Sequence, residues 1–340
     1  MAITPQISVA PVPYFWSRND YLDYYARIAE LPVDVVYVGE TVCSKRKALS
    51  ISDWLDIAAV LRDLGKQVVM STLTLIESES EISYLRSLLK ASDYWIEAND
   101  MAAVEIAHSL RRPFVAGTAL NAYNLNTLKC LRRSGMQRWQ PPVEISRDAL
   151  KALLLGLSKE SELNGLETEL LVFGRITLAH SARCFTARSE NRPKDQCEFR
   201  CGAYAEGMPL YSQDNQPLFR INGIQVQSEA SCNLLGYYNE MLSLGITHYR
   251  VAEGDMAIER PISILSTYRQ GEKHWMTLKK QPNFGSLSNV GCSYYQICLK
   301  GHRQHWERTT DHGNNTANIR STRSLLLVTK RLPGLLRTDC

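Results

Sequence analysis

An amphipathic helix, a glycine and a short β-rich run follow one another repeatedly along this chain. The glycines at four of these junctions are Gly65, Gly135, Gly165 and Gly245. A glycine just beyond the last helical residue adopts the left-handed backbone conformation easily, which ends the helix and turns the chain into the next strand. Strands that alternate with helices in this way predict βαβ units and a parallel sheet.

Eight segments have the composition of strands, and several of them are apolar on both faces, as in strands that are covered by helices outside and packed inside. Eight such units favour a (β/α)8-type, TIM-like barrel over an open doubly wound sheet. Ser52 is expected to cap the second helix. The predicted strands are 6–9, 33–39, 67–71, 94–96, 114–117, 138–140, 170–173 and 248–251, and the predicted helices are 20–30, 53–64, 79–89, 101–109, 122–133, 147–155 and 231–244.

The regular alternation stops at residues 176–229. This interval holds three cysteines and the dipeptide Asn222-Gly223, which is typical of type I′ hairpin turns. We interpret it as an insertion before the last strand, lying over the carboxyl-terminal mouth of the barrel, where barrel enzymes build their sites. The predicted organisation is a barrel at residues 1–260, followed by an irregular basic tail at 261–340 that is disordered or non-native.

Composition and charge restrict the classes of function. The chain is 44% hydrophobic and 22% charged, as globular proteins are. Residues 291–340 carry eight Lys/Arg and three Asp/Glu, a net charge of +5. Since the whole chain carries +4, residues 1–290 carry −1. We therefore expect no nucleic-acid partner for the barrel. The sequence has no apolar run of about 18 residues and no secretory signal, so we expect a cytoplasmic protein without a transmembrane segment.

Nine cysteines in a chain expected in a reducing compartment argue for metal binding or catalysis rather than for disulfides. Cys43 follows the second predicted strand, and Cys184, Cys197 and Cys201 follow the seventh. Thiolates suit zinc and iron–sulfur clusters, although the sequence lacks the CxxC knuckle of many structural zinc sites. The spacing leaves open a four-iron four-sulfur cluster, a zinc site or unrelated thiols. Cys130, on a predicted helix, is expected to be a buried, inert thiol.

Three further residues are candidates for catalysis near the substrate or metal. Glu40 ends the second predicted strand, at the mouth of the barrel. His180 is either a proton-transfer group or an ordinary loop histidine. Arg183 belongs to a set of cations around the cysteines, which either offset thiolate charge or form a solvated loop. Asn99-Asp100, after the fourth strand, also lies at the mouth, and a helix cap is the favoured interpretation there.

Other common chemistries lack their motifs. The sequence contains no GxGxxG, P-loop or HExxH pattern and no GxSxG nucleophile elbow. Dinucleotide binding, nucleotide hydrolysis and serine-hydrolase chemistry are therefore unsupported.

The runs VYVGETVCSKR, WIEANDMAAVEIA and LAHSARCFTAR, together with the later Cys-x12-Cys-x3-Cys spacing, resemble the U32 family, historically called peptidases. The resemblance covers roughly residues 1–255, and residues 291–340 depart from it. It implies a four-iron four-sulfur cluster held by Cys43, Cys184, Cys197 and Cys201.

The runs are most similar to the branch of the family that serves ubiquinone biosynthesis. This implies a role in oxygen-independent hydroxylation of an isoprenoid quinone precursor, as a heterodimer with the sister subunit UbiU. It further implies UbiT, a lipid-binding accessory protein, and prephenate as the oxygen donor. Two alternatives that the family also offers are a U32-type peptidase or hydrolase and an RNA-modification (hydroxylation) factor.

Overall fold

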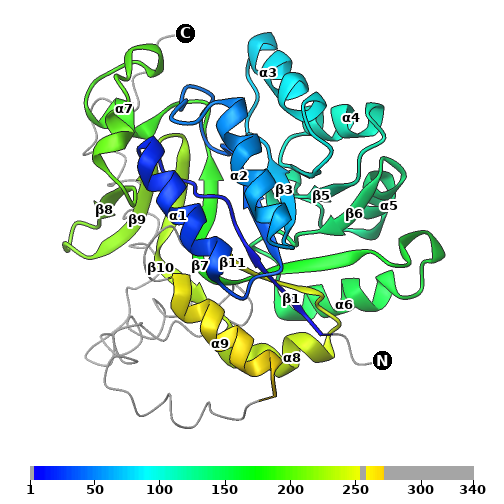
Figure 1. Cartoon of the computed structure of the whole chain (residues 1–340). Helices are drawn as coiled ribbons and strands as arrows, with labels where there is room; N and C mark the ends of the chain where they lie inside the picture. The colour runs from blue at the N-terminus through cyan, green and yellow to red at the C-terminus, as the bar shows by residue number, and fades with distance from the viewer. Residues whose placement is uncertain (1–3, 253–257, 272–340) are drawn as a thin grey trace, which may run out of the picture.

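The computed structural model of the protein describes residues 4–252 and 258–271. Within them, eight parallel strands form a closed barrel (Figure 1), because β11 pairs in parallel with both β1 and β7. The predicted TIM-like (β/α)8 barrel is confirmed, and the open sheet is excluded. The barrel strands are β1 (Gln6–Val9), β2 (Val35–Val38), β3 (Gln67–Ser71), β4 (Trp95–Ala98), β5 (Phe114–Ala116), β6 (Met136–Trp139), β7 (Glu167–His180) and β11 (His248–Ala252).

Helices cover the outside of the barrel, and the main core lies between them and the strands. A second, smaller cluster of buried apolar residues lies inside the barrel, where Val35, Tyr37, Val69 and Val115 meet. The outer helices are α1 (Arg18–Glu30), α2 (Ile51–Asp63), α3 (Glu79–Lys90), α4 (Met101–Ser109), α5 (Leu125–Arg133), α6 (Arg147–Leu157), α8 (Tyr238–Ser243) and α9 (Glu259–Arg269).

The glycines that follow the helices adopt the conformation that the sequence predicted. Gly65, Gly135, Gly165 and Gly245 have φ of 79°, 110°, 72° and 80°. A side chain is strained at these angles, and glycine is not. Each glycine therefore marks the point where the chain leaves a helix for the next strand.

Serine caps explain where four of the described helices begin, namely α1, α2, α3 and α6. Ser50 caps α2: its hydroxyl accepts from the backbone N–H of Asp53, and the Asp53 carboxylate accepts from the backbone N–H of Ser50. This reciprocal pair is a capping box. The expected cap, Ser52, is wrong by two residues, because the helix starts at Ile51 and Ser52 already lies in its first turn.

Replacement of Ser50 by alanine is expected to lower the free energy of unfolding by about 1 kcal/mol, because the backbone N–H of Asp53 loses its acceptor. The matched control is Ser52→Ala, at an exposed position in the first turn of the same helix, where alanine is a good helix former. Urea unfolding of both variants checks the prediction, and an equal loss for Ser52→Ala would contradict the assigned cap.

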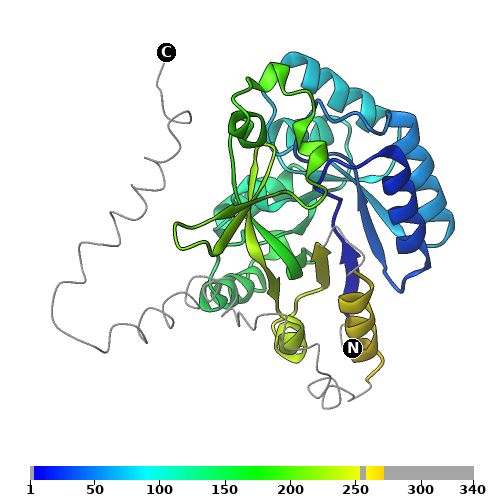
Figure 2. The same cartoon turned by 90° about the vertical axis from the view of Figure 1, so that its left-hand side faces the viewer.

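Beyond the barrel, β7 continues far past the predicted strand at 170–173. Its upper half pairs antiparallel with β10 (Gln225–Asn233), which pairs with β9 (Pro217–Asn222), which pairs with β8 (Met208–Tyr211). Figure 2 shows this sheet standing beside the barrel. Residues 176–180, expected to open the insertion, are thus the end of a barrel strand, and the stretch before β8 holds the short helix α7 (Phe185–Ser189).

Two local expectations in this region are wrong. Asn222 is the last residue of β9 and pairs with Gln225, so the two-residue turn is Gly223-Ile224. Only Gly223 has a positive φ, of 65°, which excludes a type I′ turn and fits type II′. The helix predicted at 231–244 shrinks to α8, because residues 231–233 pair with β7. The helix was predicted too long because Cys232, Leu235, Tyr238 and Met241 are all buried, and apolar residues at this spacing are also typical of one helix face.

The boundary expected at residue 260 falls inside α9. This helix buries Ile262 and Leu265 against the barrel, and its Arg269 forms an ion pair of 2.6 Å with Asp34 beside β2. Residues 272–340, most of the predicted tail, lie outside the described residues. In the described ranges, no helix combines the length and apolar character needed to cross a membrane.

Candidate functional site

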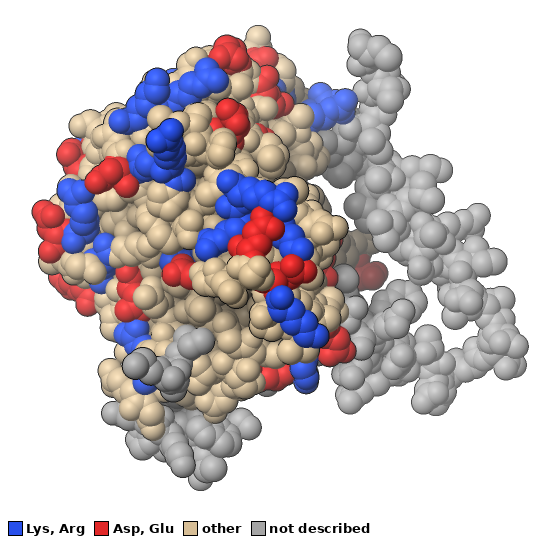
Figure 3. Space-filling view, turned by 90° about the vertical axis from the view of Figure 1, so that its right-hand side faces the viewer, with Lys and Arg blue, Asp and Glu red and all other residues tan. Residues whose placement is uncertain are grey.

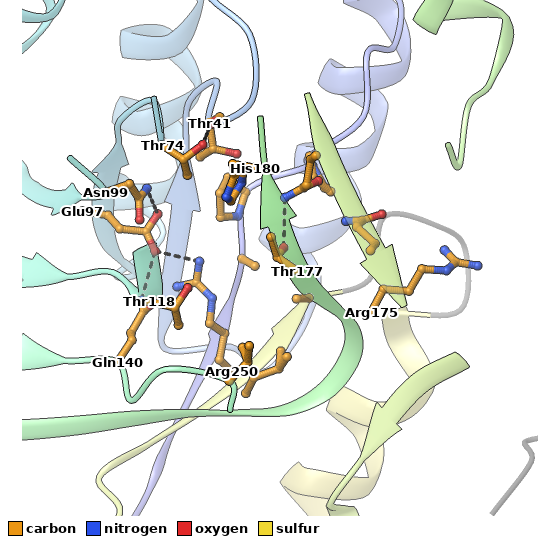
Figure 4. A pocket seen from close by; sticks show the side chains of 18 of the residues that line it. Thr41, Thr74, Glu97, Asn99, Thr118, Gln140, Arg175, Thr177, His180 and Arg250 are labelled. Carbon is orange, nitrogen blue, oxygen red and sulfur yellow. Dashed lines mark hydrogen bonds and ion pairs between the residues drawn. The ribbon is translucent and has the colours of Figure 1, made fainter. Parts of the chain in front are cut away.

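A cavity lies at the carboxyl ends of the barrel strands, and we call it the mouth pocket. Its floor contains Glu97 and Arg250, and β7 and β10 form one wall with Thr177, His180 and Gln227 (Figure 4). The position agrees with the general placement of sites in barrel proteins.

The charged groups on the floor of the mouth pocket are paired with one another. The Glu97 carboxylate lies 2.8 Å from Nη2 of Arg250 and accepts a hydrogen bond of 3.0 Å from Nε2 of Gln140. Asn99 donates to the other Glu97 oxygen at 3.5 Å. The dashed lines in Figure 4 mark these contacts. A ligand in the pocket therefore meets a pre-ordered, charge-balanced floor.

A second buried carboxylate, Glu169 on β7, extends this network into the barrel. It accepts hydrogen bonds from the hydroxyls of Ser8 and Tyr37 and lies 3.4 Å from Nη1 of Arg250 and 3.6 Å from Nη1 of Arg138. Burial alone would raise the pKa of Glu169, but the two guanidinium groups outweigh it and lower the pKa to about 2. The network keeps Glu169 ionised inside the protein.

A smaller cavity brings the four predicted cysteines together, and we call it the cysteine cavity. Cys43 reaches it from the loop after β2, and Cys184 from the start of α7, where its sulfur accepts the N–H of Ala187 at 3.4 Å. Cys197 and Cys201 line it from either side of one short turn. All four thiols are half-buried and free of disulfides.

The turn between Cys197 and Cys201 has an uncommon backbone. Glu198 and Phe199 have φ of 47° and 53°, in the left-handed region that non-glycine residues rarely occupy. Such conformations persist only where the surroundings impose them, often at sites that bind or react. Here the backbone directs both cysteines into one cavity.

Burial raises the pKa of the thiols of Cys43, Cys184 and Cys201, whereas the nearby Arg46 opposes this effect. Metal binding would therefore release protons and depend on pH. Among residues 4–252 and 258–271, no three His, Cys, Asp or Glu side chains form a group that could hold a metal ion.

The three candidate catalytic residues lie in different places. Glu40 shapes the loop of Cys43, because its carboxylate accepts the backbone N–H groups of Val42 and Cys43 at 2.8 and 3.0 Å; it lines a neighbouring cavity instead of the mouth pocket. His180 lines the mouth pocket, and Arg183 is exposed and lines neither the mouth pocket nor the cysteine cavity.

The imidazole of His180 has a ring nitrogen at the mouth pocket without a hydrogen-bond partner in the described part of the chain. This atom, Nε2, is buried. Burial lowers the pKa of His180, which favours the neutral ring that can accept or donate a proton. Of the three candidates, His180 is the one placed to touch a ligand there.

Two other expectations were tested. Asp100 caps α4 through the N–H of Ala102 at 2.7 Å, as predicted, while Asn99 is buried on the floor of the mouth pocket. Cys130 is exposed on α5, so its expected burial is wrong: it lies on the solvent side of an amphipathic helix whose Leu128 and Leu131 are buried.

The closed barrel, with one cavity at its mouth and a second lined by four cysteines, defines a TIM-barrel protein that has a thiol site. The profile of peptidase family U32 matches residues 23–296, which include all four cysteines. The chain belongs to this family.

Several solved structures show a low similarity to this chain. Dihydropteroate synthase of Xanthomonas albilineans is 11% identical, with a TM-score of 0.39 over 83% of this chain and 96% of that one. A putative dihydrodipicolinate synthase family protein of Coccidioides immitis is 8% identical, with a TM-score of 0.42 over 99% of both chains. A GH18 chitinase of Pseudoalteromonas aurantia is 10% identical, with a TM-score of 0.40 over 76% and 98%. These likenesses carry no conclusion about function.

Proposed function

We propose that this chain is the iron–sulfur subunit of an oxygen-independent hydroxylase in ubiquinone biosynthesis, the UbiV member of the U32 family, acting as a heterodimer with UbiU. The observation that carries the proposal is the cysteine cavity, where thiols from the loop after β2 and from the segment after β7 meet. Their residue types and the sequence runs around them support a four-iron four-sulfur cluster.

Four thiolates are the usual ligand set of a four-iron four-sulfur cluster, and the sequence runs around these cysteines favour such a cluster over a zinc ion. Cys43, Cys184, Cys197 and Cys201 would be its ligands, and the cluster would supply one-electron transfer when bound.

The mouth pocket is the proposed place of the polar reactants. Its ionised floor groups already pair with each other, so it suits a small polar molecule held by hydrogen bonds. The hydroxyl of Thr118 lies on its lining, and His180 is placed to move a proton. Since dioxygen takes no part, the oxygen atom needs another donor, for which we propose prephenate. The isoprenoid tail would stay outside this pocket, with UbiT as its lipid-binding carrier.

Complementation tests the proposed function. Expression of the chain with UbiU, in anaerobically grown cells that lack UbiV, is expected to restore ubiquinone, and the two chains are expected to copurify. The matched control carries Cys43→Ser and is expected to restore none. Equal ubiquinone content with the wild-type chain and with an empty vector would contradict the proposal.

The alternatives of the family remain testable. Cleavage of peptides by the iron-free protein would favour a hydrolase. RNA modification needs an extended basic surface, and on the face in Figure 3 Lys and Arg lie among Asp and Glu. Elsewhere in the described residues, cations are also paired with carboxylates, as Lys129 is with Glu160 at 2.7 Å. Steeply salt-dependent RNA binding would favour this alternative.

A further inference from the structure

Arg46 is a buried cation at the cysteine cavity. Its side chain is 1% exposed, and its guanidinium donates from Nη1 to the carbonyl oxygen of Pro13 and from Nη2 to Oδ1 of Asn222, both at 2.7 Å. It lines the cysteine cavity together with the four cysteines. The guanidinium is thus held by two hydrogen bonds beside the candidate ligands.

The other cations that line the cysteine cavity are partly exposed and paired with carboxylates. Lys45 lies 2.9 Å from Asp195, Lys194 pairs with Glu77, and Arg200 lies 3.1 Å from Glu190. Solvent screens such charges strongly. Arg46 therefore supplies the buried positive charge of the described cavity lining.

One carboxylate opposes this charge at close range. Oε1 of Glu40 lies 3.8 Å from Nη1 of Arg46, and the same oxygen accepts the backbone N–H of Cys43. Glu40 and Arg46 thus stand on the same loop as the first cysteine, with opposite charges and little solvent between them.

We propose that Arg46 and Glu40 set the reduction potential of the metal group held by the four cysteines, Arg46 raising it and Glu40 lowering it. The inference rests on the proposed function. Reduction adds one electron to the group, and a fixed cation stabilises the extra negative charge, more strongly in a buried setting than in water. Hydrogen bonds to the sulfurs and nearby net charge are established determinants of such potentials.

The setting of Arg46 also joins the two cavities. Asn222, which holds Nη2, donates to the carbonyl oxygen of Pro13 at 2.6 Å and to Oε1 of Gln225 at 3.1 Å. Pro13 and Gln225 line the mouth pocket. Arg46 is therefore connected through hydrogen bonds to residues that line the mouth pocket. We class Arg46 as a positioning residue that tunes the thiol site.

Redox titration of the purified, iron-loaded full chain tests the proposal, with dithionite as reductant, mediator dyes and spectroscopic detection of the reduced state. Arg46→Gln is expected to shift the midpoint potential to a more negative value, and Glu40→Gln to a more positive value. Arg46→Lys, which keeps the charge, is expected to stay near the wild type. The matched control is Lys47→Gln, an equal loss of charge at the neighbouring exposed position, with a several-fold smaller shift.

Each outcome separates the inference from the proposed function. A wild-type chain that binds no iron would reject the cluster, and the inference with it. Iron-loaded Arg46→Gln and Glu40→Gln with unchanged potentials would reject the inference alone, as would lowered thermal stability without a potential shift, which marks a purely structural role. If Arg46→Gln fails to hold iron, the potential of Glu40→Gln decides the question: a positive shift supports the inference, and an unchanged potential rejects it.

Discussion

Anaerobically purified Cys184→Ser is expected to lose its iron, from about four atoms per chain to nearly none. Serine offers a hard oxygen in place of a soft thiolate, which weakens the binding of iron at this position. The same result is expected for Cys43, Cys197 and Cys201, because all four thiols line one cavity. Iron and acid-labile sulfide analysis measures the loss.

The matched control for this series is Cys130→Ser. Cys130 is exposed on α5 and lines neither the mouth pocket nor the cysteine cavity, so its replacement is expected to leave the iron content unchanged. Iron loss from Cys130→Ser equal to that from Cys184→Ser, or full iron content in all four ligand variants, would refute the assignment.

Glu169→Gln is expected to lower the free energy of unfolding at pH 7 by about 3 kcal/mol. The carboxylate is fully buried between Arg250 and Arg138, and its loss removes a negative charge that offsets the positive charges of these two buried guanidinium groups. Each arginine keeps a second carboxylate, Glu97 or Glu167, at 2.8 Å, which limits the cost. Urea unfolding measures the change.

The pH dependence of this effect follows from the pKa of Glu169, which lies at about 2 rather than at its ordinary 4.5. Between these values the unfolded chain binds the proton more readily, so stability from this group is complete above pH 4.5 and lost as the pH falls through 2. The difference in the free energy of unfolding between the wild type and Glu169→Gln should therefore become smaller as the pH falls from 4.5 to 2. The control is Glu162→Gln, at an exposed ion pair with Arg133, which should change stability little; a gap independent of pH would contradict the assignment.

Much of the architecture was predictable because it depends on local chemistry. The glycines after the helices and the apolar strands are read directly from the sequence, and together they predict a barrel. The boundaries that failed depend on distant partners. β7 is far longer than expected because β10 pairs with it, and the cap of α2 is Ser50 because the helix starts before Asp53.

The four cysteines of the cysteine cavity could be predicted from the sequence, since cysteines that follow two different strands of a barrel lie at the same end of it.

The charged floor of the mouth pocket was not predicted. Glu97, Arg138, Glu169 and Arg250 each sit inside a strand, and only closure of the barrel shows that their side chains meet. A signal existed, because a charged residue within a strand that helices cover outside must point into the barrel. Glu40 lies beside Cys43 and not in the mouth pocket, because its own loop turns the carboxylate back onto backbone N–H groups.

The central claim is that the four cysteines hold an iron–sulfur cluster. The most direct test is anaerobic purification of the full chain, followed by determination of iron, acid-labile sulfide and zinc. We predict about four irons and four sulfides per chain, with negligible zinc. One zinc per chain without iron would contradict the account and make the cysteine cavity a structural metal site.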